Sequence, residues 1–210
     1  MSIVCVIQAR LNSERLPGKV LLPLGDKFVL QQAVERIHRS KNVDQIIVAT
    51  SIKKSDDLIA QLAPTFGAQV HRGSETDVLA RLSTAARAAD ATRMVRITAD
   101  CPFIDPVVID AVVERAVSTD ADYTSNTLER TFPRGSGVEV CKIKRMATVV
   151  DEATEPYQRD HVTHKIGSIL NAKTTPRSQV PKSSPIMYIR VAPTAESPSM
   201  VPTATEWWAR

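Results

Sequence analysis

Short apolar runs alternate with amphipathic stretches over the first 125 residues, and this alternation restricts the fold more than any other feature of the sequence. The β-branched runs predict strands, which cover residues 3–8, 45–50, 68–71 and 94–98, with a further candidate at 122–125. Between them, apolar residues at helical spacing predict helices at 28–40, 55–66, 76–86 and 106–116. Strands that alternate with helices are typical of βαβ units, so we expect an α/β fold with a mostly parallel sheet and helices on both faces.

The pattern changes in the last 85 residues. A strand from a different part of the sheet and two helices are predicted there, at residues 138–141, 145–153 and 158–170. From residue 172 onward proline, serine and threonine are frequent, and no clear period remains apart from a strand candidate at 186–191. We therefore expect one domain over residues 1–170 and a divergent, Pro/Ser/Thr-rich segment over residues 171–210.

Composition narrows the classes of ligand and partner. The chain has 210 residues with a net charge of +4, 43% hydrophobic and 4% aromatic residues. This mild basic excess suits an anionic ligand, whereas the scarcity of aromatic residues disfavours a nucleic-acid partner. No apolar run approaches the ~18–20 residues that cross a bilayer, and the amino terminus lacks the basic stretch of a signal peptide. Cys5, Cys101 and Cys141 are far apart and form no metal-binding pair, so we expect a cytoplasmic protein with free thiols and no membrane partner.

The loop after the first predicted strand carries the clearest chemical signal. Open parallel sheets bind ligands at the carboxyl ends of their strands, which is where this loop lies. It contains Arg10, Arg15 and Lys19 with Ser13 between them, and neither of the two common glycine-rich phosphate motifs. Arginine forks and a lysine ammonium together suit a triphosphate. The alternative is a solvated basic loop without a ligand.

Asp100 closes the strand predicted at 94–98, at the same edge of the sheet. A carboxylate among basic groups is suited to holding Mg²⁺ against phosphate oxygens. Two alternatives involve no metal: Asp100 caps the turn before Pro102, or it pairs with Arg96.

Other polar residues give weaker signals. His161 and His164, beside Asp160, have the spacing of metal ligands, but we favour the interpretation that they belong to the polar face of a helix. The acidic pair Asp56–Asp57 is expected to favour a helix N-terminus electrostatically. Residues 120–122 (Asp-Ala-Asp) have the form of the metal motif of glycosyltransferases, but they precede a predicted strand instead of following one.

Several segments taken together resemble the cytidylyltransferase family, and the nearest branch is that of the spore-coat polysaccharide biosynthesis F-type proteins. The segments are, in order, IQARLNSERLPGKVLLPLGDK, IIVATS, HRGSETDVLARL, VRITADCPFIDP and DYTSNT. The resemblance runs from residue 3 to about residue 166. It implies that residues 1–170 form a nucleotidyltransferase domain with a three-layer α/β/α sandwich, the Rossmann-like nucleotide-diphospho-sugar transferase fold.

The resemblance also assigns site residues. It implies catalytic roles for Arg15, Lys19 and Asp100, with Asp100 as the ligand of Mg²⁺. It implies a nucleotide site made by Arg10, Ser13, Arg15, Lys19, Ala49, Thr50, Ser51, Gly73, Ser74 and Asp77. It places Asn126, Glu139 and His161 in segments that face the sugar.

The implied activity is transfer of CMP from CTP to an acidic sugar, for a surface polysaccharide or glycan, by a homodimer. Two departures from the family keep a second hypothesis open. Gly137 stands where the family often has an aspartate, and no aspartate follows Asp160. The second hypothesis is a catalytically impaired homologue that binds a nucleotide or sugar, and the third is a glycosyltransferase of the same fold.

Overall fold

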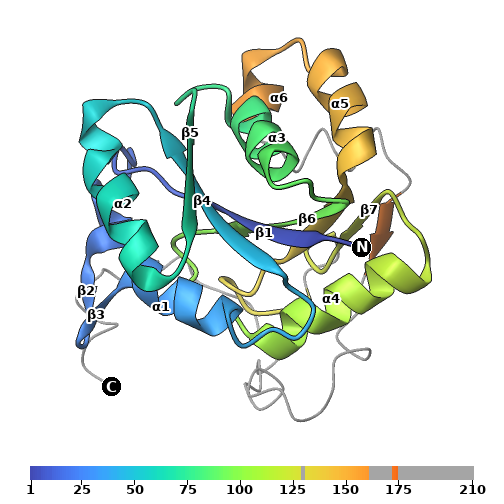
Figure 1. Ribbon diagram of the computed structural model, residues 1–210, viewed down its shortest axis with the longest axis horizontal. Helices are drawn as coiled ribbons and strands as arrows, with labels where there is room; N and C mark the ends of the chain where they lie inside the picture. Colours follow the sequence, from blue (N-terminus) through green and yellow to red (C-terminus); the bar gives the residue numbers. More distant parts are fainter. Residues whose placement is uncertain (129–130, 161–171, 175–210) are drawn as a thin grey trace, which may run out of the picture.

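A computed structural model describes residues 1–128, 131–160 and 172–174 of the chain. A seven-stranded sheet runs through the centre of this part, in the order β5-β4-β1-β6-β8-β7-β9 (Figure 1). The strands are β1 (Ile3–Gln8), β4 (Gln45–Ser51), β5 (Gln69–Gly73), β6 (Arg93–Thr98), β7 (Tyr123–Ser125), β8 (Glu139–Lys142) and β9 (Ala172–Thr174).

All neighbouring strands run parallel except at β8. The ladders β5–β4, β4–β1, β1–β6 and β7–β9 are parallel, whereas β8 lies antiparallel between β6 and β7. The predicted mostly parallel sheet is thereby confirmed. Residues 138–141, predicted as a strand from a different part of the sheet, contribute to β8 between β6 and β7. Because β8 is reversed, it begins at the edge of the sheet where β6 and β7 end.

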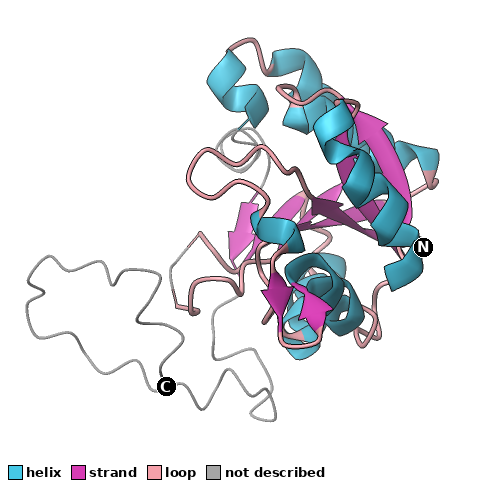
Figure 2. Ribbon diagram, turned by 90° about the vertical axis from the view of Figure 1, so that its left-hand side faces the viewer, coloured by secondary structure: helices cyan, strands magenta, loops and turns pink. Residues whose placement is uncertain are grey.

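Helices cover both faces of the sheet, as the α/β/α prediction requires (Figures 1 and 2). On one face lie α1 (Val29–Ile37), α2 (Asp57–Leu62) and α4 (Pro106–Ser118), and on the other lie α3 (Val78–Ala88) and α5 (Ile143–Glu152), with α6 (Pro156–Asp160) beside α3. A hydrophobic core lies on each face of the sheet, and successive side chains of β1 point to opposite faces. Cys5 and Ile7 pack in the core with α1, α2 and α4, whereas Val4 and Val6 pack in the core with α3 and α5.

The helices begin where local chemistry predicts. The Asp77 carboxylate accepts a hydrogen bond from the Ala80 amide at the start of α3 (3.0 Å). At the start of α4, Asp105 accepts from the Val107 amide (2.9 Å), and Pro106 occupies the first turn. Within the described residues no helix is both long and apolar enough to span a membrane.

Some short elements escaped prediction. The hairpin of β2 (Pro23–Leu24) and β3 (Lys27–Phe28) and the 3-10 turn η1 (Lys19–Leu21) have too few residues to show a period. The helix predicted at 55–66 is present as three consecutive pieces, the 3-10 turn η2 (Lys54–Asp56), α2 and the 3-10 turn η3 (Ala63–Phe66). Strand β9 falls in the stretch from residue 172 onward where no element was predicted before residue 186, and it pairs with β7. Most of the helix predicted at 158–170 and the strand predicted at 186–191 lie outside the described residues.

Candidate functional site

A cavity of about 460 Å³ opens at the carboxyl ends of β1 and β6. It gathers the residues that the sequence singled out for phosphate and metal binding, although they lie up to ninety positions apart in the chain. Its lining consists of Gln8, Arg10, Ser13, Glu14, Arg15, Lys19, Val20, Arg96, Thr98, Ala99 and Asp100.

The loop of residues 9–18 leaves part of its positive charge unpaired. Gly18 has a left-handed backbone (φ 73°) and its amide donates to the Leu11 carbonyl (2.8 Å), which folds the loop back on itself before Lys19. Lys19 forms an ion pair with Asp100. Arg10 and Arg15 make no hydrogen bond or ion pair with any residue that the structure describes. Arg10 is close enough to Glu75 to contribute to lowering the pKa of that carboxyl, but neither guanidinium is bonded to an anion, so both can bind an anionic ligand on the cavity wall.

Asp100 is ionised at neutral pH. Burial acts to raise the pKa of its carboxyl, but hydrogen bonds from Lys19 and Thr98 outweigh burial and hold that pKa below its usual range. Its side chain is 39% exposed, on the cavity. The partner of Asp100 is Lys19, and the guanidinium of Arg96 is hydrogen bonded to Gln8 and Glu139 instead.

A second cavity, of about 390 Å³, adjoins the first. Its lining consists of Arg96, Thr98, Cys101, Asn126, Thr127, Phe132, Pro133, Arg134, Gly135, Gly137 and Glu139. The Asn126 side chain donates to the Ser136 carbonyl and accepts from the Val138 amide (both 2.8 Å), so it holds together the two ends of the segment between β7 and β8. The two predicted sugar-facing residues that the structure describes, Asn126 and Glu139, thus share this cavity, whereas His161 lies outside the described residues.

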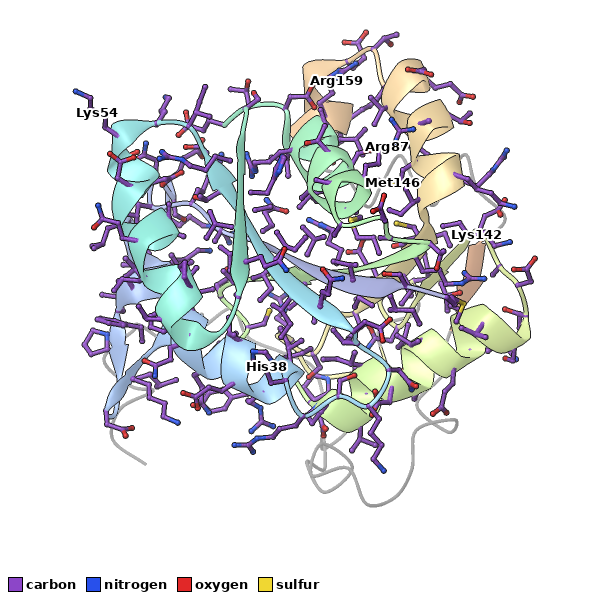
Figure 3. All side chains as sticks on the ribbon, viewed as in Figure 1. His38, Lys54, Arg87, Lys142, Met146 and Arg159 are labelled. Carbon is purple, nitrogen blue, oxygen red and sulfur yellow. The ribbon has the colours of Figure 1, made fainter. Side chains whose placement is uncertain are left out.

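The remaining predicted nucleotide residues lie at the ends of β4 and β5, outside the lining of the first cavity. Ala49, Thr50 and Ser51 are buried at the end of β4. The other three predicted nucleotide residues, Gly73, Ser74 and Asp77, lie between the end of β5 and the start of α3. Besides capping α3, Asp77 forms an ion pair with Arg159 of α6 (2.5 Å), and Figure 3 shows Arg159 beside that helix.

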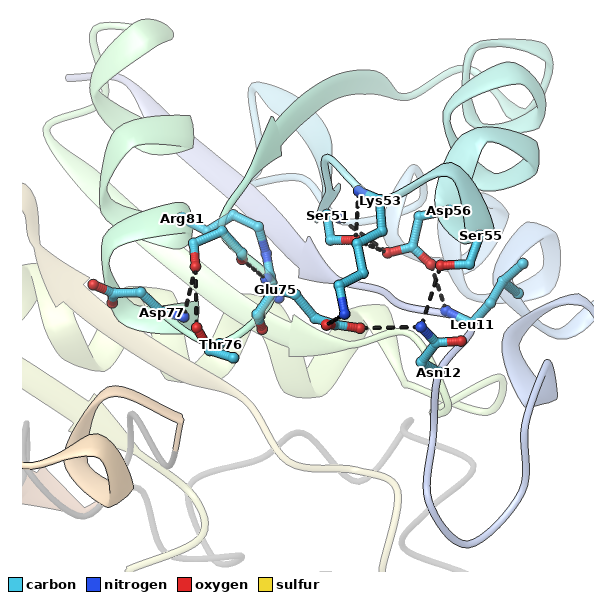
Figure 4. A network of polar contacts seen from close by, with 11 residues as sticks. Leu11, Asn12, Ser51, Lys53, Ser55, Asp56, Glu75, Thr76, Asp77 and Arg81 are labelled. Carbon is cyan, nitrogen blue, oxygen red and sulfur yellow. Dashed lines mark hydrogen bonds and ion pairs between the residues drawn. The ribbon is translucent and has the colours of Figure 1, made fainter.

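A polar network joins the loop of residues 9–18 to the carboxyl ends of β4 and β5 (Figure 4). The fully buried Asp56 carboxylate accepts from the amides of Leu11 (2.8 Å) and Ser51 (3.1 Å) and from the Ser51 hydroxyl. Asn12 donates to Glu75 (3.1 Å), and Lys53 forms an ion pair with the same carboxylate. As predicted, Asp56 and Asp57 stand at the start of α2. The Asp56 carboxylate makes no capping hydrogen bond there, and instead it joins the loop after β1 to the end of β4.

The acidic residues 120–122 lie at the opposite edge of the sheet. They precede β7, and Asp120 forms ion pairs with Arg93 (2.9 Å) and Lys142 (2.8 Å). Figure 3 shows Lys142 on that side of the molecule. No cluster of three or more His, Cys, Asp or Glu side chains suited to a metal is found within residues 1–128, 131–160 and 172–174.

Sequence reasoning missed Asp56 as an anchor and Arg96 as a cavity residue. Arg96 carried a detectable signal, because it is a charged residue between the apolar residues Val95 and Ile97 of a predicted strand. Asp56 carried none, since its partners lie 45 and 5 positions away and nothing local distinguishes it from Asp57.

The sandwich and the cationic cavity at its carboxyl edge define the protein as a three-layer α/β fold with a site suited to an anionic ligand. The chain belongs to the cytidylyltransferase family, whose sequence profile matches residues 4–185. A cytidylyltransferase structure from Leptospira borgpetersenii is 31% identical with a TM-score of 0.80, over 84% of this chain and 76% of that one. A CMP:2-keto-3-deoxy-manno-octonic acid synthetase complexed with CTP shares the fold at 18% identity, with a TM-score of 0.65 over 84% of this chain and 90% of the other.

An uncharacterized protein of Methanocaldococcus jannaschii is 42% identical over 163 residues, which is 78% of this chain and 66% of that protein. The spore coat polysaccharide biosynthesis protein SpsF of Bacillus subtilis is 39% identical over 126 residues, 58% of this chain and 52% of SpsF. The chain thus matches about half to two thirds of the length of these relatives.

Proposed function

We propose that the protein transfers CMP from CTP to an acidic sugar and releases pyrophosphate. The observation that carries this proposal is the meeting of Arg10, Arg15 and the Lys19–Asp100 pair in one cavity that adjoins a second. Family membership supports CTP as the donor, and the relatives include a 3-deoxy-manno-octulosonate cytidylyltransferase of Trichlorobacter lovleyi, 36% identical over 115 residues, 54% of this chain and 44% of that protein.

In this reaction an acceptor hydroxyl attacks the α-phosphorus of CTP. A new oxygen–phosphorus bond forms, the bond to the bridging oxygen of pyrophosphate breaks in line, and the hydroxyl proton leaves to solvent. Catalysis then consists mainly of positioning and charge neutralisation. Arg10 and Ser13 would hold the triphosphate, and Arg15 and Lys19 would neutralise the charge that grows on pyrophosphate.

The donor set fits Mg²⁺ that arrives with the nucleotide. Mg²⁺ in nucleotide sites is bound by one or two carboxylates together with substrate phosphate oxygens and water. Asp100 supplies one ionised carboxylate on the cavity. When bound, the ion would neutralise phosphate charge, and Lys19 would then be released from Asp100 toward the phosphates.

The other predicted residues complete the proposal. The ends of β4 and β5, with Ala49, Thr50, Ser51, Gly73, Ser74 and Asp77, would lie near the base and ribose. Asn126 and Glu139 would face the acceptor in the second cavity. The Asn126 amide would act there by holding the cavity wall, since both its donor and its acceptor are used by the backbone.

The test is pyrophosphate release from CTP and Mg²⁺ with a panel of 2-keto-3-deoxy sugar acids. We expect release with at least one acid, greater with CTP than with UTP. A folded protein that binds CTP but releases no pyrophosphate with any acid contradicts the proposal.

One observation favours a binding protein without catalysis. Gly137, where the family often carries an aspartate, lines the second cavity, and a Cβ there would come within 3.0 Å of Thr127 Cγ2. A protein of this kind would bind CTP with the same affinity with and without Mg²⁺. Calorimetry in the presence and absence of Mg²⁺ separates the two functions.

A further inference from the structure

Arg96 lies on the wall between the two cavities. Arg96 and Thr98 of β6 line both of them, and just beyond, Asp100 lines the first cavity while Cys101 lines the second. The carboxyl end of β6 is therefore the ridge that separates the cavities, and Arg96 places a guanidinium on that ridge.

The hydrogen bonds of this guanidinium connect the two cavities. Arg96 Nη2 donates to Gln8 Oε1 (2.9 Å), which lines the first cavity, and Nη1 donates to Glu139 Oε1 (2.7 Å), which lines the second. Strand register explains the geometry, because Arg96 is directly opposite Glu139 in the β6–β8 ladder and Gln8 ends β1 opposite Thr98. The side chains of Arg96 and Glu139 are only 11% and 13% exposed. The guanidinium is therefore oriented before a ligand binds, as preorganised charge stabilisation requires.

A nucleotidyl transfer brings its two substrates together at such a ridge. With phosphates in the first cavity and the acceptor in the second, the reacting phosphorus lies where the cavities meet. A guanidinium at that place is suited to bind a planar or tetrahedral oxyanion. We propose that Arg96 contacts a substrate oxyanion at this junction, supplied by the α-phosphate of the nucleotide or the acidic group of the acceptor, and that Gln8 and Glu139 are its positioning residues. This inference rests on the proposed function.

Comparing the binding of CMP with that of cytidine tests whether the oxyanion is the α-phosphate or the acidic group of the acceptor, since CMP and cytidine differ only in the α-phosphate. If the oxyanion is the α-phosphate, the wild-type protein binds CMP more tightly than cytidine in calorimetry, and Arg96→Gln reduces that preference about tenfold or more. Arg93→Gln is the matched control. Arg93 is on the same strand, is as buried, and also holds a carboxylate, but at the opposite edge of the sheet. We expect it to keep the preference.

If the oxyanion belongs to the acceptor, Arg96→Gln keeps the CMP preference and raises the KM for the sugar acid about tenfold or more, with the KM for CTP unchanged. In either case we expect Arg96→Lys to recover only part of the lost CMP preference or acceptor affinity, because lysine keeps the positive charge but not the two parallel N–H donors of the guanidinium. Thermal unfolding verifies that each variant is folded, and Arg96→Lys carries the test if Arg96→Gln does not fold.

The proposal is overturned if the folded Arg96 variants keep both the CMP preference and the acceptor KM, or if Arg93→Gln loses as much as Arg96→Gln. A wild-type protein that releases no pyrophosphate with any acid refutes the proposed function instead. The CMP and cytidine titrations would still decide whether Arg96 binds the α-phosphate.

Discussion

The two edges of the sheet hold similar charged side chains and use them differently. At the amino edge, Arg93 and Lys142 bind the Asp120 carboxylate and also donate to the backbone carbonyls of Ala121 (3.0 Å) and Asp120 (2.7 Å). These bonds fix the turn before β7, where Asp120 has a left-handed backbone (φ 46°). These two cations are therefore satisfied by the protein itself.

At the carboxyl edge, Lys19 bonds a carboxylate side chain that is itself open to a cavity, and Arg10 and Arg15 have no bonded partner among the described residues. The comparison shows that partners, more than residue types, distinguish a structural charge cluster from a ligand site. Charges that hold backbone carbonyls stabilise the fold, and charges left facing a cavity are available to a substrate.

The largest effect expected from this comparison is on turnover. Asp100→Asn should lower kcat about 10²–10³-fold, because it removes a preorganised charge at the phosphates. Asp120→Asn, the same chemical change at the amino edge, should keep the wild-type rate. Steady-state pyrophosphate release checks both, and equal losses in the two variants would abolish the distinction between the edges.

Next in size is the effect of Asp56→Ala on stability. The substitution leaves the buried amide of Ser51 and the partly buried amide of Leu11 without their acceptor, so we expect it to lower the free energy of unfolding by about 1–3 kcal/mol. Asp57→Ala, at the neighbouring position, removes an exposed ion pair with Arg72 and should cost less than about 1 kcal/mol. Urea titration measures both, and similar losses would show that Asp56 is not an anchor.

A smaller effect concerns affinity. Arg15→Gln should weaken CTP binding about tenfold, since it removes a charged donor from the cavity. The salt dependence of binding should also decrease, because fewer ionic contacts remain to be screened. Lys144→Gln removes an exposed cation at the amino edge and should leave both unchanged. Calorimetry at two salt concentrations gives the answer, and equal weakening by both variants would point to net charge alone.

The smallest effect is a pH dependence at the amino edge. A hydrogen bond from Lys142 holds the pKa of Asp120 below its ordinary value of 3.8. Because the folded-state pKa is depressed, Asp120 stabilises the fold above pH 3.8, and this contribution is lost as pH falls through the folded-state pKa. The stability difference between the wild-type protein and Asp120→Asn should therefore be constant near neutral pH and shrink in acid. A difference that grows in acid would contradict the direction of the shift.

Much of this comparison could be predicted from the sequence, because strands such as residues 3–8 and the basic loop after them are local patterns. Parallel topology then brought Lys19 and Asp100 to one edge without further information. The roles of Asp56 and Arg96 could not be predicted in this way. Both depend on side-chain contacts between strands, such as Arg96 to Glu139, that are fixed only when register is known.

The reversed direction of β8 has a consequence for how the proposed acceptor site can diversify. Because β8 starts at the carboxyl edge, the connection between β7 and β8 begins and ends at that edge. Asn126, at its start, is hydrogen bonded to Ser136 and Val138, at its end. Insertions between residues 126 and 136 would reshape the second cavity while every ladder of the sheet keeps its pairing. We therefore expect related chains to vary most in length in the connection between β7 and β8, where new specificities can evolve at little cost to folding.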